Sequence, residues 1–267
     1  MRYVVALRYL GGDFCGFQVQ PGKRTVQGCL NESFAALFGC PCAVTGCSRT
    51  DSGVHARAFC ATIEPLSAAA PHIPAEKLPL AVAALLPPDL SVVAAGDAPD
   101  GFHPRHDVAE KEYRYTILNT PTADPFYTGR VWHYPRPIGE EALRAMQQAA
   151  ALFVGRHDFR SFMAEGAHIA DTVRTVFSCS CRRAGTRLLL SVSGDGFLYN
   201  MVRILTGTLV EIGEGKYPPD EMAAILGARD RRSAGMTAPP QGLCLHRVVY
   251  PAGCIPEAVH RALCETE

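Results

Sequence analysis

The spacing of apolar and polar positions predicts a chain of alternating strands and helices. Thr25 begins a helix that ends near Phe38, because apolar residues between them recur every three or four positions on one face. Up to residue 98 the pattern predicts, in order, a strand at 2–10, this helix, strands at 42–48 and 57–64, a helix at 74–86 and a strand at 91–98. The order β-α-β-β-α-β is that of a split βαβ unit.

The second half of the chain resembles the first, with additions. The pattern predicts strands at 110–119, 130–134, 174–182, 187–194 and 245–250 and helices at 139–153, 198–212 and 218–226. We therefore expect an α/β (α+β) protein of two related split-βαβ domains, ferredoxin- or RRM-like, with mainly antiparallel sheets. The expected domains are 1–103 and 104–267, flanking a central cleft that is the expected place for a site.

Composition narrows the class of protein. Hydrophobic residues make up 48% of the chain, which suits globular cores and excludes a disordered or fibrous protein. No apolar stretch approaches the ~18 residues of a membrane span. The apolar segment Tyr3 to Leu7 is closed by Arg8 and is too short for a secretory signal. We expect a soluble cytoplasmic protein with no membrane partner.

The 11 cysteines are expected to be free thiols, since the number is odd and nothing marks export. Cys40/Cys42 and Cys179/Cys181 are separated by one residue, which suits strand alternation better than a zinc site. We expect no metal site. A metal- or redox-dependent enzyme that uses the cysteines stays open as an alternative, which metal analysis and thiol titration would test.

The charge balance is neutral, with 26 basic and 26 acidic residues, so it does not by itself indicate a nucleic-acid partner. Of the basic residues, 22 are Arg and 4 are Lys. Arg grips phosphate in two places and stacks on bases, whereas Lys offers a point charge. The excess of Arg is also what a GC-rich genome produces, and both interpretations stay open.

Three segments carry candidate chemistry. In CSRTDSGVHAR (47–57), Asp51 follows a strand and precedes Gly53, where the backbone can bend, and Arg49 favours the ionised carboxylate. An ionised carboxylate beside a cation suits a nucleophile, although an Asx-turn is the commoner role of an isolated Thr-Asp-x-Gly. In KEYRY (111–115), Tyr113 lies between cations on a strand, as in platforms that stack a base or in a core ladder.

The third segment, FLYNMVR (197–203), opens an amphipathic helix. Its apolar residues face a core, while Tyr199, Arg203 and Gly207 recur at i, i+4 and i+8 on an adjoining face. Arg203 at the edge of so apolar a helix either needs a carboxylate partner or extends to solvent, and the helix alone does not decide.

Together these segments resemble the TruA family of tRNA pseudouridine synthases. The likeness runs through nine blocks in family order: YLGGDFCGFQ (9–18), TVQ (25–27), RTDSGVHA (49–56), FHPR (102–105), KEYRY (111–115), HDF (157–159), TVR (172–174), FLYNMVR (197–203) and GLCL (242–245). Departures from the family pattern are Phe17 in place of Trp, Ser48 and Ser52 around the Arg-Thr-Asp core, and Ala58-Phe59 after the loop. None touches the expected chemistry.

The resemblance implies a role for five residues. Asp51 is the catalytic aspartate, Arg203 its salt-bridge partner and Tyr113 the ring that packs on the target base. Arg49 moves into the RNA to hold the flipped nucleotide, and Leu245 lines the uridine pocket. The sequence does not decide whether Asp51 adds to the ribose, assists a glycal route or attacks the ring.

The resemblance also implies tRNA as substrate, a homodimer and no cofactor. Two segments are expected to contact the tRNA backbone: Phe102, His103, Pro104, Arg105 and His106, and His168, Ile169, Ala170, Asp171 and Thr172. The compact chain resembles the bacterial-type members, which act at positions 38–40 of the anticodon stem-loop. A non-catalytic RNA-binding protein on the same fold is the alternative, and a tritium-release assay would discriminate.

Overall fold

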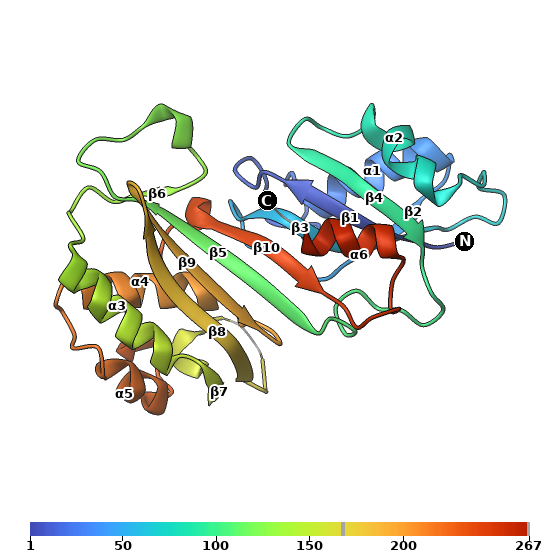
Figure 1. Cartoon of the computed structure of the whole chain (residues 1–267). Helices are drawn as coiled ribbons and strands as arrows, with labels where there is room; N and C mark the ends of the chain where they lie inside the picture. Colours follow the sequence, from blue (N-terminus) through green and yellow to red (C-terminus); the bar gives the residue numbers. More distant parts are fainter. Residues whose placement is uncertain (167–168, 266–267) are drawn as a thin grey trace. The chain divides into compact units, whose positions relative to one another are not determined.

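The computed structural model describes residues 1–166 and 169–265, and these form two compact units (Figure 1). Unit 1 comprises Met1–Lys111 together with the C-terminal segment from Cys244 onward, and unit 2 comprises Glu112–Leu243. The sequence-based division differs, since it assigned everything after residue 103 to the second domain. The C-terminal segment belongs to unit 1 here because its strand pairs with a strand of that unit and its helix packs there.

Unit 1 contains a sheet of five strands: β1 (Tyr3–Tyr9), β2 (Cys42–Gly46), β3 (His55–Pro65), β4 (Leu90–Asp97) and β10 (Leu243–Val249). β1 lies between β3 and β4 and is antiparallel to both, and β2 is antiparallel to β3. The order β4-β1-β3-β2 is that of a split βαβ unit, so the mixed α/β class with mainly antiparallel strands is confirmed. β10 joins β3 in parallel.

Helices cover both faces of this sheet. α1 (Val26–Phe38) packs on the face of β1 that carries Tyr3, whose ring stacks on Phe38. Gly96 pairs with Val4 and therefore lies on the other face, where a Cβ would meet Pro256 at the start of α6 (Glu257–Cys264). α2 (Leu78–Ala83), preceded by the 3-10 turn η1 (Ala75–Lys77), packs against β4.

The predicted start of α1 is confirmed. Thr25 is extended, and its side-chain oxygen accepts a hydrogen bond from the Gly28 N–H at 3.2 Å. At the other end Gly39 takes a left-handed conformation with φ 68°, which ends the helix.

Unit 2 combines strands in the order β5-β9-β8-β7 with three α-helices. Its strands are β5 (Glu110–Leu118, whose first two residues fall in unit 1), β6 (Trp132–His133), β7 (Gly155–Asp158), β8 (Val173–Ala184) and β9 (Arg187–Gly194). Its helices are α3 (Glu140–Leu152), α4 (Met201–Gly213) and α5 (Glu221–Ala228), with 3-10 turns η2 (Pro125–Tyr127), η3 (Arg160–Phe162), η4 (Arg231–Ser233) and η5 (Pro240–Gly242). α3 packs against β8 and α4, and α5 packs against α3 and η3.

Two elements, β7 and α6, were not predicted from the sequence. β7 is four residues long, GRHD, and has no apolar alternation, so only its pairing with β8 makes it a strand. α6 is eight residues long with two buried apolar side chains, Val259 and Leu263, which is too short a pattern for a helix prediction.

Within residues 1–166 and 169–265, no helix is long and apolar enough to cross a membrane. The same part of the chain holds no cluster of three or more His, Cys, Asp or Glu side chains arranged to bind a metal ion. All 11 cysteines are free thiols.

Candidate active site

Asp51 lies in the loop between β2 and β3. Two strands, β2 and β10, pair with different parts of the same edge of β3. β2 pairs with β3 from Cys42 opposite Pro65 to Gly46 opposite Ala61. At the start of β3, His55 and Ala56 pair instead with Cys244 and Leu245 of β10. The loop 47–54 therefore leaves the sheet where one partner strand ends and the other begins.

The same arrangement brings Leu245 to this loop. Leu245 is fully buried and pairs in register with Ala56, the second residue of β3. The position of Leu245 next to Ala56 follows from the pairing of β10 with β3, and no local sequence pattern in either strand indicates it. In unit 1, Leu245 thus lies beside the start of β3, directly after the loop that carries Arg49 and Asp51.

Hydrogen bonds to β1 and to residues 14–17 hold the loop 47–54 in place. The hydroxyl groups of Tyr9 and Thr50 are bonded at 2.8 Å, and both side chains are buried. The Phe17 N–H donates to the Thr50 carbonyl at 3.1 Å, and the Gly53 N–H donates to the Phe14 carbonyl at 3.3 Å. The residues on either side of Asp51 are thereby fixed to β1 and to residues 14–17.

Two glycines, Gly11 and Gly16, let the segment after β1 lie close to the loop 47–54. Gly11 donates its N–H to His55 Nδ1 at 2.9 Å, and a Cβ at Gly11 would lie 2.5 Å from the Val54 carbonyl carbon. Gly16 has φ +83°, and a Cβ there would lie 2.7 Å from the Thr50 carbonyl oxygen. No side chain fits at either position without moving the loop.

Lys111 binds the start of the loop. Its ammonium group donates to the Cys47 carbonyl at 2.7 Å, and the residue is only 8% exposed. The Cys60 N–H, which lies opposite, is bonded to Cys47 Sγ at 3.4 Å. The thiol thus serves as the acceptor for Cys60, and the Cys47 carbonyl is turned to the ammonium group.

Positive charge gathers beside this loop. Burial lowers the pKa of Arg105, and the neighbouring guanidinium of Arg49 lowers it further. Burial raises the pKa of the Cys47 thiol, which Lys111 and Arg105 oppose by their charge. Lys111 and Arg105 therefore lie beside the start of the segment that carries Asp51, and Arg49 is part of that segment. Such a region favours an anion.

The segment 102–106 combines two buried anchors with three more exposed polar residues. Phe102 and Pro104 are buried; the ring of Phe102 lies 5.3 Å from that of Tyr250, whose hydroxyl donates to the Pro104 carbonyl at 2.5 Å. His103 and Arg105 are half-buried and His106 is exposed. The two anchors are thus more buried than the three polar residues of the turn.

His103 organises this turn. Its Nδ1 accepts the N–H groups of Arg105 at 3.1 Å and His106 at 3.3 Å, which requires Nδ1 to be unprotonated. Burial lowers the pKa of His103, with smaller contributions from His106 and Arg105. The neutral imidazole therefore maintains the turn.

Tyr113 and Arg203 lie in unit 2. Tyr113 is 7% exposed, and its ring meets that of Phe197 edge to face at 5.2 Å. Arg203 is on α4, where its Nε donates to the Ala238 carbonyl at 2.8 Å and its Nη1 donates to Asn200 Oδ1 at 2.7 Å. These contacts fix the plane of the guanidinium group.

The same strand face carries Tyr115, whose hydroxyl donates to the Pro239 carbonyl at 2.6 Å. Burial raises the pKa of Tyr115, and the positive charge of Arg203 partly opposes this. Tyr113 and Tyr115 are two positions apart on β5 and share one face of the strand, and Arg203 is thus near that face.

The other segment expected to contact RNA is described only in part. His168 lies outside the described residues, whereas Ile169, Ala170 and Asp171 are exposed. Thr172 is buried, and its hydroxyl donates to Asp158 Oδ1 at 2.6 Å. Thr172 therefore anchors the end of this segment.

Sequence reasoning missed two contacts of the site. The bond of Lys111 to Cys47 joins residues 64 positions apart and has no local signal. The carbonyl of Ala238 as a partner of Arg203 is equally non-local, with 35 positions between them. No side-chain chemistry marks Ala238, so the sequence held no signal for it.

Comparison with known proteins gives this architecture a family. A family model described as tRNA pseudouridine synthase matches residues 149–251. Proteins named tRNA pseudouridine synthase A are 43% identical over 91% of this chain in Halalkalibacterium halodurans and 43% identical over 93% in Citrifermentans bemidjiense, covering 90% and 97% of those proteins. In Bacillus subtilis (strain 168) the identity is 42% over 94% of this chain and 99% of the relative.

Among solved structures, a chain of a crystal structure titled as a Cbf5-Nop10-Gar1 complex covers 91% of this chain and 58% of its own, with 12% identity and a TM-score of 0.35, too low to establish a common fold. The relatives are similar over nearly their whole length. A mixed α/β isomerase is the class that these findings define. This chain belongs to the tRNA pseudouridine synthase A family, as its sequence motifs predicted.

Proposed function

We propose that this enzyme converts uridine to pseudouridine in tRNA, with Asp51 as the nucleophile. The reaction breaks the N1–C1′ bond, rotates the uracil and joins C5 to C1′, so it needs neither an energy source nor a cofactor. The observation that supports this most is the loop 47–54. It is bonded to other segments on both sides of Asp51, it contains Arg49, and two further cations, Lys111 and Arg105, lie beside it.

The surroundings of the loop suit an ionised nucleophile. A carboxylate attacks only in its charged form, and nearby cations favour that form. In the proposal Arg203 pairs with the Asp51 carboxylate, and the bonds from Arg203 to Ala238 and Asn200 keep its guanidinium in one orientation. Whether the carboxylate adds to the ribose, assists a glycal route or attacks the ring stays open.

The substrate must leave its stack before it reacts, which costs a few kcal/mol. We assign Tyr113 to pack on the everted base, Leu245 to line its pocket and Arg49 to take the vacated place in the RNA. Arg49 is exposed, as a residue that enters a bound RNA must be. Tyr113 is held by Phe197, so that its ring is already oriented.

The tRNA backbone is assigned to the basic turn and to the segment near Thr172. Arg105, His103 and His106 offer polar groups for phosphate, with Phe102 and Pro104 as their buried support. Positions 38–40 of the anticodon stem-loop are the proposed targets, in a homodimer across which the tRNA lies. The cytoplasm is the proposed location of the reaction.

The decisive experiment is Asp51→Asn, with Asp100→Asn as a matched control at an exposed position of the same unit. Tritium release from 5-tritiated uridine in tRNA measures turnover, and filter binding measures affinity. We expect Asp51→Asn to abolish turnover while tRNA affinity stays within about tenfold, roughly 1.4 kcal/mol. Asp100→Asn keeps both. Turnover at the normal rate in Asp51→Asn would exclude the nucleophile.

The finer assignments have their own tests. Arg203→Ala is expected to stop turnover, because the carboxylate loses its partner; a near-normal rate means that the two do not pair. Mapping carbodiimide-adducted pseudouridines in tRNA from cells that lack the gene tests the target positions. Sedimentation equilibrium of the purified enzyme tests the homodimer.

A further inference from the structure

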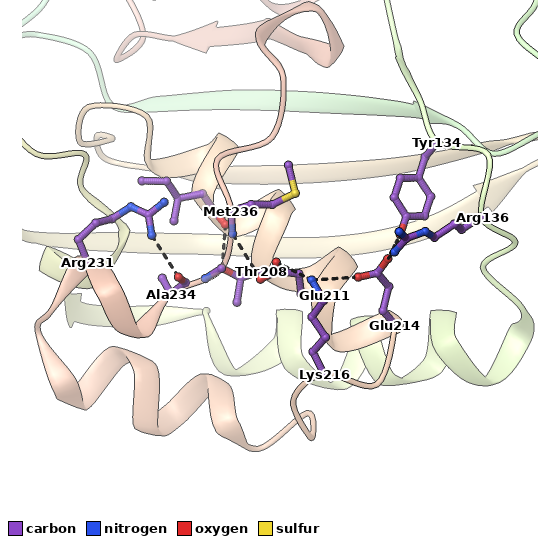
Figure 2. Close-up of polar contacts among 11 residues, drawn as sticks. Tyr134, Arg136, Thr208, Glu211, Glu214, Lys216, Arg231, Ala234 and Met236 are labelled. Carbon is purple, nitrogen blue, oxygen red and sulfur yellow. Dashed lines mark hydrogen bonds and ion pairs between the residues drawn. The ribbon is translucent and has the colours of Figure 1, made fainter.

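One face of α4 is covered by the segment 231–238, which follows α5 (Figure 2). Arg203, Gly207 and Glu211 recur on this face at i, i+4 and i+8, and Thr208 lies beside them. The segment runs past all of these positions. Arg203 therefore lies on the face of α4 that contacts the segment 231–238.

Two side chains of α4 hold the middle of the segment. Thr208 Oγ1 accepts the Gly235 N–H at 2.9 Å and donates to the Ile204 carbonyl at 2.8 Å. Glu211 Oε2 accepts the Met236 N–H at 3.3 Å, while its Oε1 is paired with Lys216 Nζ at 3.0 Å (Figure 2). Two backbone N–H groups in the middle of the segment thus bond to side chains of α4.

Facing glycines set how closely the segment lies on the helix. A Cβ at Gly207 would lie 2.8 Å from the Met236 carbonyl carbon, and a Cβ at Gly235 would lie 2.8 Å from Thr208 Cα. These are backbone atoms, which cannot turn aside as a flexible side chain does. The separation is fixed by the absence of both side chains.

The end of the segment binds Arg203. The Ala238 N–H donates to the Arg203 carbonyl at 3.0 Å, and the Ala238 carbonyl accepts Arg203 Nε at 2.8 Å. Arg231 braces the segment internally, with Nη1 bonded to the Ala234 carbonyl and Nη2 to Thr237 Oγ1, both at 3.1 Å. Gly235 and Ala238 therefore belong to one braced segment that contacts α4 at both residues.

We propose that Thr208, Glu211 and Gly235 are positioning residues for catalysis. They set the height of the segment 231–238 over α4, and the Ala238 carbonyl then orients Arg203. The inference rests on the proposed function, because it takes Arg203 to be part of the active site. It adds three residues that touch neither the substrate nor the reacting atoms.

The test compares two buried threonines of the same helix. Thr206 and Thr208 are both 0% exposed, and both donate to the carbonyl four residues earlier at 2.8 Å. Thr208 in addition accepts from Gly235. Thr208→Val thus removes the contact with the segment, and Thr206→Val is the matched control.

We expect Thr208→Val to lower kcat about tenfold relative to Thr206→Val, with the KM for tRNA within about threefold, since an orienting contact acts on the reacting geometry. Thr208→Ser keeps the hydroxyl group and is expected to restore kcat. Circular dichroism at the assay temperature gives the folded fraction to which each rate is referred. Equal kcat in the two valine variants would overturn the inference.

Gly235→Ala tests the same point through packing, with Gly227→Ala as its control, since a Cβ at Gly227 meets nothing within 4 Å. We expect Gly235→Ala to lower kcat about 10- to 100-fold and Gly227→Ala to leave it unchanged. Arg203→Ala is measured alongside. A normal rate in Arg203→Ala refutes the proposed role of Arg203, whereas an inactive Arg203→Ala beside fully active Thr208→Val and Gly235→Ala refutes only the positioning role.

Discussion

The contact between Gly11 and the loop 47–54 allows a test with two adjacent glycines. A Cβ at Gly11 would lie 2.5 Å from the Val54 carbonyl carbon and 3.0 Å from its nitrogen, whereas a Cβ at Gly12 meets nothing within 4 Å. Neither glycine has a positive φ, so alanine is compatible with both backbones. Gly11→Ala therefore creates a steric clash with the backbone of Val54, whereas Gly12→Ala creates none.

The size of the effect follows from the overlap. Carbon atoms that are not bonded rest about 3.5–4.0 Å apart, so the chains must separate by about 1 Å. Overpacking of this kind costs about 1–3 kcal/mol. At roughly 2–4 °C per kcal/mol for a chain of this length, Tm falls by about 2–12 °C. The shift also breaks the Gly11 N–H bond to His55 and moves the loop that carries Asp51.

Displacement of a catalytic group by about 1 Å can cost about 100-fold in rate. We expect Gly11→Ala to lower kcat by about that factor, measured by tritium release below its reduced Tm, while Gly12→Ala matches the wild type in both kcat and Tm. If Gly11→Ala equals Gly12→Ala in both measurements, the approach of Gly11 does not hold the loop. If Tm falls while kcat stays normal, the approach matters for stability and not for catalysis.

Two further substitutions test the scaffold. Thr25→Ala removes the side chain that accepts the Gly28 N–H at the start of α1, and we expect thermal unfolding to show a loss of about 1 kcal/mol, whereas an unchanged Tm would mean that water replaces this cap. Tyr134→Phe removes the hydroxyl group that bonds Glu214, a bond that is the largest cause of the lowered pKa of Glu214 (Figure 2). A carboxyl group whose pKa is lowered by folding stabilises above its unfolded pKa and loses this effect as pH falls through the folded pKa. We therefore expect urea unfolding to give a difference between wild type and Tyr134→Phe that is large at about pH 7 and shrinks towards about pH 3; a difference independent of pH would show that the bond does not act through the charge of Glu214.

Much of the architecture was determined by local sequence. The strand patterns place β1, β2, β3, β4 and β9 within a few residues of their observed bounds, because each buries alternate or continuous apolar side chains. Thr25 marks the start of α1 correctly, since capping is satisfied by residues three positions apart. The motif around Asp51 and the family were also apparent without coordinates, because they depend on the order of residues alone.

The tertiary structure decided which distant residues meet. The parallel pairing of β10 with β3 places Leu245 beside Ala56 and groups the C-terminal segment with unit 1, although its sequence pattern is that of an ordinary closing strand. The bonds of Lys111 to Cys47 and of Arg203 to Ala238 likewise join residues that share no local pattern. Periodicity records which face of an element is buried, but the partner on that face is selected by packing and by the pairing of backbone groups across the whole chain.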